Sequence, residues 1–225
     1  MKYFFLTCSI FMMSCSMQKS IVSDYSMEGF NIASLKGSSI RLYINPVIDI
    51  GDLDEPFEKE YTSNNLFRSI LTDKLKEKLG KFSTISIDPN VNMDALFLNQ
   101  SPSDNSARVK GLLEQINENY VLGIKRVIIS KRVNQNPQEP QTIPSMGTSR
   151  NRPTAGSSTK EVKKPDDCVM KIVAEVWSVK EKKKVAGFTS IGESKIFLLM
   201  YGRAFNEALD NSISNIADYI EENNE

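Results

Sequence analysis

The spacing of apolar residues changes period along this chain, and that alternation restricts the folds it can adopt. Ile40, Leu42 and Ile44 recur at every second position, which predicts a strand with one apolar face. Between residues 64 and 79 the spacing becomes three and four, which predicts a helix that Gly80 can terminate. The two periods predict the next elements in chain order: a strand at 82–87, a helical turn at 91–98, a helix at 109–116 and a strand at 120–129.

The C-terminal part shows the strand pattern twice before it returns to the helical one. Within residues 168–176 the apolar side chains fall on one face, whereas Lys171 and Glu175 fall on the other. This alternation predicts a sheet with one covered face and one partly solvated face. The remaining predicted elements are a strand at 185–191 and an amphipathic helix at 205–220.

Residues 134–166 interrupt these patterns. Five of the nine prolines fall here, among Gln, Asn, Ser, Thr and Gly residues that cannot bury enough apolar surface to offset the entropy of ordering. We therefore expect a disordered insertion rather than a domain. The order of elements is then β-α-β-α-β, insertion, β-β-α. It predicts an α+β fold, close to α/β, in which a mixed sheet of about five strands carries two to three helices.

The composition excludes several kinds of chemistry. The 225 residues include no histidine, which rules out Ser-His-Asp and Cys-His nucleophiles and histidine-ligated metals. The 28 basic and 28 acidic side chains cancel, which argues against a nucleic-acid-binding surface. The acidic loop at 49–60 lacks the spacing and turn glycine of an EF-hand, so no metal or other cofactor is expected. Cys168 is expected to be a buried apolar residue, and no catalytic residue is assigned.

The N-terminus carries a sorting signal. Lys2 precedes an uncharged, largely apolar run from Tyr3 to Met13. As a helix this run would span less than about 20 Å, which is too short for the roughly 30 Å hydrocarbon core of a bilayer. It therefore predicts a signal peptide over residues 1–14. The sequence that follows resembles the lipobox of bacterial lipoproteins, in which the cysteine is lipidated and becomes the first mature residue: Met12-Met13-Ser14-Cys15.

The lipobox implies that Cys15 carries acyl chains such as palmitate. Two or more chains of this kind hold a protein stably on a membrane. By analogy with these lipoproteins, Ser16 beside the lipidated cysteine favours the outer membrane, with the protein on its periplasmic face. We expect the polar residues 15–38 to be a lipidated tether and residues 39–225 to be a single domain that includes the insertion.

The order of elements resembles a group of bacterial envelope proteins. The group includes the penicillin-binding-protein activator lipoproteins, the curli secretion channel lipoprotein and the N-terminal domain of the Tol-system periplasmic protein. The resemblance covers residues 39–220, and its motif is Tyr120–Gly123, where a helix flows into a strand. It implies a periplasmic domain that binds an envelope protein. The lipopolysaccharide-assembly lipoproteins share a related order and an opening like Tyr25–Ile32, but usually lack a helix such as 109–116.

These features predict a non-catalytic binding or scaffold module in cell-envelope assembly, wall synthesis or export. One alternative is an outer-membrane lipoprotein of the lipopolysaccharide-assembly type. Another is a carboxylate-dependent hydrolase, which needs two carboxyl groups in one cleft. The oligomeric state is left open.

The most apolar stretch of the mature chain is either a core segment or a docking patch for a protein partner. Trp177, on the more solvated strand face, is either a contact residue of the same kind or a residue packed under the loop. The candidate docking residues besides Trp177 are Ile196, Phe197, Leu198, Leu199, Met200 and Tyr201.

Overall fold

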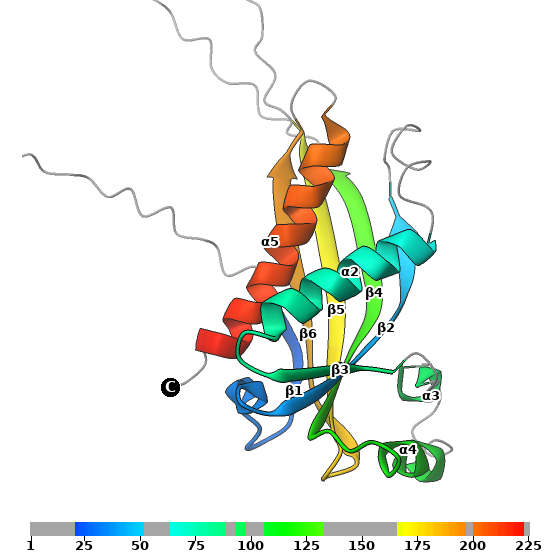
Figure 1. The fold of residues 1–225 in the computed structure, drawn as a ribbon. Coiled ribbons are helices and arrows are strands. Elements are labelled where there is room, and N and C mark those ends of the chain that lie inside the picture. The colour runs from blue at the N-terminus through cyan, green and yellow to red at the C-terminus, as the bar shows by residue number, and fades with distance from the viewer. Residues whose placement is uncertain are drawn as a thin grey trace, which may run out of the picture.

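The computed structural model describes residues 21–51, 64–88, 93–97, 106–132, 166–196 and 200–222 (Figure 1). The predicted signal peptide, Cys15 and nearly all of the predicted insertion lie outside these ranges. The elements in chain order are β1 (Ile21–Ser26), η1 (Ile32–Leu35), β2 (Ser39–Ile50), α2 (Asn64–Leu79), β3 (Thr84–Ile87), α3 (Asp94–Phe97), α4 (Ser106–Leu113), β4 (Tyr120–Arg132), β5 (Asp167–Ser178), β6 (Lys183–Lys195) and α5 (Tyr201–Glu222).

The strands form one mixed sheet of six in the order β1-β6-β5-β4-β2-β3. Strand β2 runs parallel to both β3 and β4, whereas β4, β5, β6 and β1 pair antiparallel in turn. The parallel pairs are those joined by helical connections, which parallel strands require. The predicted α+β class with a mixed sheet is confirmed, with six strands.

Helices α2 and α5 lie across one face of the sheet (Figure 1). The stripe predicted for α2 is buried, since Leu71, Leu75 and Leu79 are all fully covered. Helix α5 packs directly on β6: a Cβ built on Gly192 would lie 2.0 Å from the backbone oxygen of Ala208. Only a glycine at that strand position permits so close an approach of the helix.

The main core fills the space between this face and the two helices. It contains the predicted apolar face of β5, together with alternate residues of β2, β4 and β6. Phe67 of α2 meets Phe205 of α5 edge to face, with ring centroids 5.8 Å apart. Cys168 is fully buried in this core and forms no disulfide.

The opposite face of the sheet is covered differently. Helices α3 and α4 pack at one end of it, where they form a second, smaller apolar cluster with Val121. Tyr43, Trp177 and Val179 pack against this cluster and are partly buried. The ring of Phe97 fills the space above Gly123, where a Cβ would lie only 1.9 Å from the ring.

The folded domain starts earlier than the sequence pattern predicted. Residues 21–38, which we expected to belong to a tether, contain β1 and η1, and β1 pairs with β6 along the edge of the sheet. Ile32 and Leu35 of η1 are buried in the main core. The pattern missed β1 because five of its six residues are exposed and carry no apolar alternation.

Strand β2 is longer than predicted. The prediction ended it before Pro46, because proline cannot donate a ladder hydrogen bond. The strand instead continues to Ile50, and the pairing of β2 with β4 is irregular between Ile44 and Val47. The proline thus lies within this irregularity, where its missing N–H breaks no regular ladder bond.

Candidate functional site

The face of the sheet away from α2 and α5 presents a strip of mixed apolar and charged side chains, which we call the open face. Its members come from neighbouring strands, placed on one side by the strand register. Val22, Tyr25 and Val47 are strongly exposed, at 51%, 43% and 62%. The open face comprises Val22, Tyr25, Val47, Asp49, Arg126, Ile128, Lys171, Val173, Glu175, Lys184, Thr189 and Ile191.

The centre of the open face is organised around one carboxylate. Glu175 Oε1 of β5 forms ion pairs with Lys125 Nζ at 3.5 Å and Lys184 Nζ at 3.4 Å, from the strands on either side. Its side chain is only 12% exposed, although it lies on the solvated face. The predicted alternation along β5 is therefore observed, with Lys171 and Glu175 opposite the core. Apolar side chains on this face therefore lie around a carboxylate that two lysines hold in place.

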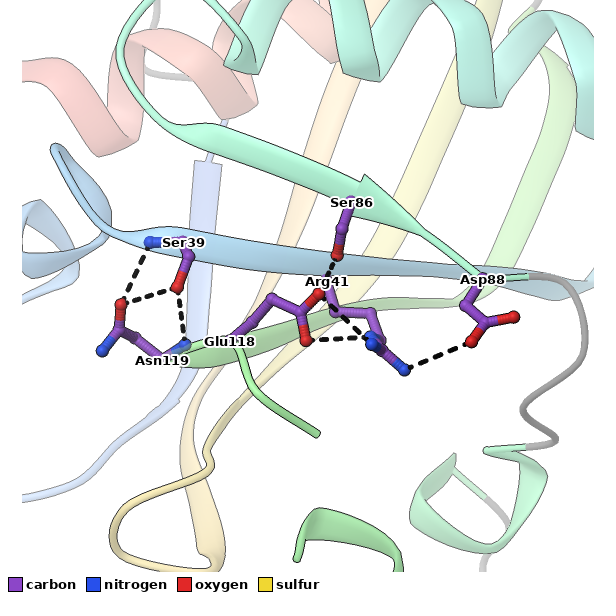
Figure 2. Close-up of polar contacts among 6 residues, drawn as sticks. All are labelled: Ser39, Arg41, Ser86, Asp88, Glu118 and Asn119. Carbon is purple, nitrogen blue, oxygen red and sulfur yellow. Dashed lines mark hydrogen bonds and ion pairs between the residues drawn. The ribbon is translucent and has the colours of Figure 1, made fainter. Parts of the chain in front are cut away.

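A polar cluster ties the beginning of three strands together (Figure 2). Arg41 of β2 donates from Nε and Nη2 to the Glu118 carboxylate, at 3.0 and 3.2 Å. Ser86 of β3 donates to the same carboxylate, and Arg41 Nη1 lies 3.8 Å from Asp88. Beside this pair, the backbone N–H of Asn119 donates to Ser39 Oγ at 3.0 Å.

The electrostatics of this cluster are those of a structural ion pair. Burial alone would raise the pKa of Glu118, but the hydrogen bonds from Ser86 and Arg41 outweigh it and hold that pKa below its ordinary value. Arg41 is 8% exposed, so these partners compensate a charge that is largely shielded from water. A general acid requires a raised pKa, and this carboxylate has the opposite shift.

A second polar contact holds α3 over the sheet. The Tyr43 hydroxyl donates to Asp94 Oδ1 at 2.5 Å, and Asn45 Nδ2 donates to the same oxygen at 2.8 Å. The rings of Tyr43 and Phe97 also stack, with their centroids 5.4 Å apart. Burial first, and then the bond to Asp94, raise the pKa of Tyr43 to about 12.

The candidate docking residues that the structure describes differ in their exposure. Ile196 is buried at 8% exposure and belongs to the main core, and Tyr201, the first residue of α5, packs against that core. Met200 is 53% exposed. Phe197, Leu198 and Leu199 lie outside the described residues, so the docking role of the segment stays a prediction.

Trp177 packs against the second cluster rather than reaching fully into solvent. Its indole Nε1 is buried and has no hydrogen-bond partner among the described residues. Sequence reasoning predicted a partly solvated sheet face but not which residues of the other strands lie on it, and it missed the Arg41–Glu118 pair. The pair joins residues 77 positions apart, and no local pattern connects them.

Within the described ranges, no group of three or more Cys, Asp and Glu side chains is placed to hold a metal ion. In the same part of the chain, no helix has the length and apolar character needed to cross a membrane.

Comparisons with known proteins give fold-level similarities alone. No family model matches the chain, and no curated protein matches its sequence. Similar solved structures include a PelC dodecamer from Paraburkholderia phytofirmans, at 10% identity and a TM-score of 0.36, covering 89% of this chain and 95% of that one. The hypothetical protein CT253 from Chlamydia trachomatis matches at 8% identity and a TM-score of 0.43, covering 84% of this chain and 99% of that one.

The C-terminal domain of LpoB from Salmonella enterica is similar at 14% identity and a TM-score of 0.29, covering 75% of this chain and 87% of that one. With identities this low and TM-scores below 0.5, these similarities carry no function to this chain.

Proposed function

We propose that this protein is a lipid-anchored binding module on the periplasmic face of the outer membrane, and that it has no catalytic centre of its own. The anchor is Cys15, and the binding surface is the open face. The observation that carries the proposal is the asymmetry of the sheet. One face is sealed by α2 and α5, whereas the other presents apolar side chains among fixed charges.

The geometry favours binding over hydrolysis. Carboxylate-dependent hydrolysis needs one carboxyl group kept protonated and a second one free to act as nucleophile or base. Two pairs of carboxylates in the described residues share an arginine: Arg41 contacts Glu118 and Asp88, and Arg132 contacts Asp167 and Glu193. Glu175 is likewise engaged by two lysines. These groups are neutralised by cations rather than poised for proton transfer.

The anchor is tested by radiolabelled palmitate. We expect the wild-type chain to incorporate the label and to fractionate with outer membranes, and the Cys15→Ser variant to do neither. An unlabelled wild-type chain would contradict the proposal.

The binding surface is tested by site-specific photo-crosslinking in intact cells. A crosslinker replaces Val173, on the open face, or Asn206, an exposed residue of α5 on the other side of the sheet. We expect a discrete crosslinked envelope protein from position 173 alone. Equal products from both positions, or none from position 173, would contradict a binding role for the open face.

A further inference from the structure

The chain that joins the predicted anchor to the fold is short. Ile21 is the first residue of β1, so only residues 16–20 separate it from Cys15. Even fully extended, the chain from Cys15 to Ile21 reaches about 20 Å, because each residue contributes at most about 3.3–3.6 Å. A tether that ended at residue 38 could have reached about 80 Å on the same basis. The start of β1 must therefore stay near the surface that holds the acyl chains.

The irregularity in β1 places its two exposed large hydrophobic side chains on the same face. Val22 pairs with Thr189 and Tyr25 pairs with Gly187, and the register shifts between Ser23 and Tyr25. In a regular strand, residues three apart point to opposite faces. The bulge inserts one extra residue, so Val22 and Tyr25 both lie on the open face.

The chemistry of this edge matches the interface of a bilayer. Val22 and Tyr25 are two of the five exposed large hydrophobic residues in the described part of the chain. The Lys184 ammonium lies 5.2 Å from the centre of the Tyr25 ring. An aromatic ring with a polar tip is favoured at headgroup depth, and a lysine can pack its stem along apolar surface while its charge faces phosphate.

We propose that the β1 end of the open face, formed by Val22, Tyr25 and Lys184, rests on the headgroup layer of the bilayer that holds the acyl chains of Cys15. This inference rests on the proposed lipid anchor. It assigns the open face two occupants. The edge at β1 contacts lipid, and the strands further from β1 remain available to a protein partner.

Fluorescence quenching by lipid tests the contact, because the chain has a single tryptophan. In a Trp177→Phe background, Tyr25→Trp places the probe on the edge strand β1. Ile87→Trp places a matched control on β3, the opposite edge, at a position 41% exposed compared with 43% for Tyr25. Five strand spacings separate these edges, which is about 24 Å. Val22→Trp replaces the first variant should it fail to fold, as judged by circular dichroism.

Each full-length, lipidated variant is reconstituted in phosphatidylethanolamine–phosphatidylglycerol vesicles that contain a shallow nitroxide-labelled lipid. We expect the Tyr25→Trp variant to be quenched at least twofold more than the Ile87→Trp variant at every protein-to-lipid ratio. Equal quenching would overturn the inference. A difference that appears only at high protein density would also overturn it and would assign the edge to a second copy. Palmitate incorporation is measured in the same samples, so a missing anchor is distinguished from a labelled protein whose edge avoids lipid.

Discussion

The Arg41–Glu118 pair gives a prediction whose size follows from the structure. The change is Glu118→Gln, which keeps the shape of the side chain and removes its charge. Arg41 is 8% exposed and loses the carboxylate that accepts two of its hydrogen bonds. Asp88 is a poor substitute, since it is 3.8 Å away and 36% exposed.

Removing one member of a buried pair costs about 3–5 kcal/mol, because the remaining charge is left without compensation. The glutamine amide still offers one acceptor, so we expect a loss of about 3 kcal/mol in the free energy of unfolding. For a domain of this size that corresponds to a drop of roughly 6–12 °C in Tm. Urea unfolding at pH 7, followed by Trp177 fluorescence, measures the loss.

The double variant Arg41→Met/Glu118→Leu is the control, because a buried ion pair can be replaced by apolar residues at little net cost. We expect it to be more stable than Glu118→Gln by about 2 kcal/mol or more. A Glu118→Gln loss below about 1 kcal/mol, or a double variant as unstable as the single one, would refute the reasoning.

The pH dependence gives an independent check. The folded-state pKa of Glu118 is below its ordinary value of 4.5. The ionised group therefore contributes stability that is fully present above that value and is lost as the pH falls through the folded-state pKa. The difference between wild type and Glu118→Gln should shrink as the pH falls from 5 towards 2. A difference that stays constant over that range contradicts the assignment.

Three further predictions concern packing and buried groups. Gly192→Ala should prevent α5 from packing on β6 and lower the free energy of unfolding by about 3 kcal/mol or more. Gly187→Ala is the control on the same strand and should be tolerated, because a Cβ there has its nearest contact at 3.8 Å. Thermal unfolding compares the two variants. Burial raises the pKa of the Cys168 thiol to about 11, so it should resist a thiol reagent at pH 8 until the domain is unfolded. Burial, and then the bond to Asp94, raise the pKa of Tyr43 to about 12, so its protonated hydroxyl contributes stability that is complete below pH 10 and is lost as the pH rises to 12. In the Tyr43→Phe variant, the free energy of unfolding should therefore change less between pH 10 and pH 12.

The elements with strong local periodicity could be predicted from the sequence. Helix α2 spans residues 64–79 as predicted, because its apolar stripe and Gly80 mark it locally. The two faces of β5 also follow their predicted alternation. Strand β1 could not be predicted, because an edge strand with five exposed residues is specified by its neighbour β6 rather than by its own pattern.

The candidate site is a product of tertiary structure and was largely beyond sequence reasoning. The open face collects side chains from several strands, and the neighbours of Glu175 are known only once the register is known. The bulge that turns Val22 and Tyr25 to one side has no glycine or proline to mark it. Sequence reasoning predicted a partly solvated sheet face, and the structure supplied the residues on it. The anchor at Cys15 stays a prediction.

Strand β1, the first strand of the domain, pairs only with β6, the last one. Ile21 pairs with Ser190, so β1 is synthesised early but cannot pair until residues 183–195 have followed. Such a distant pairing forms late, because the entropy of closing a long loop is lost before the contacts between the strands form. Until then the outer edge of β6 offers its unpaired backbone groups to any extended chain nearby. Deleting β1 would therefore leave a protein prone to strand-to-strand self-association.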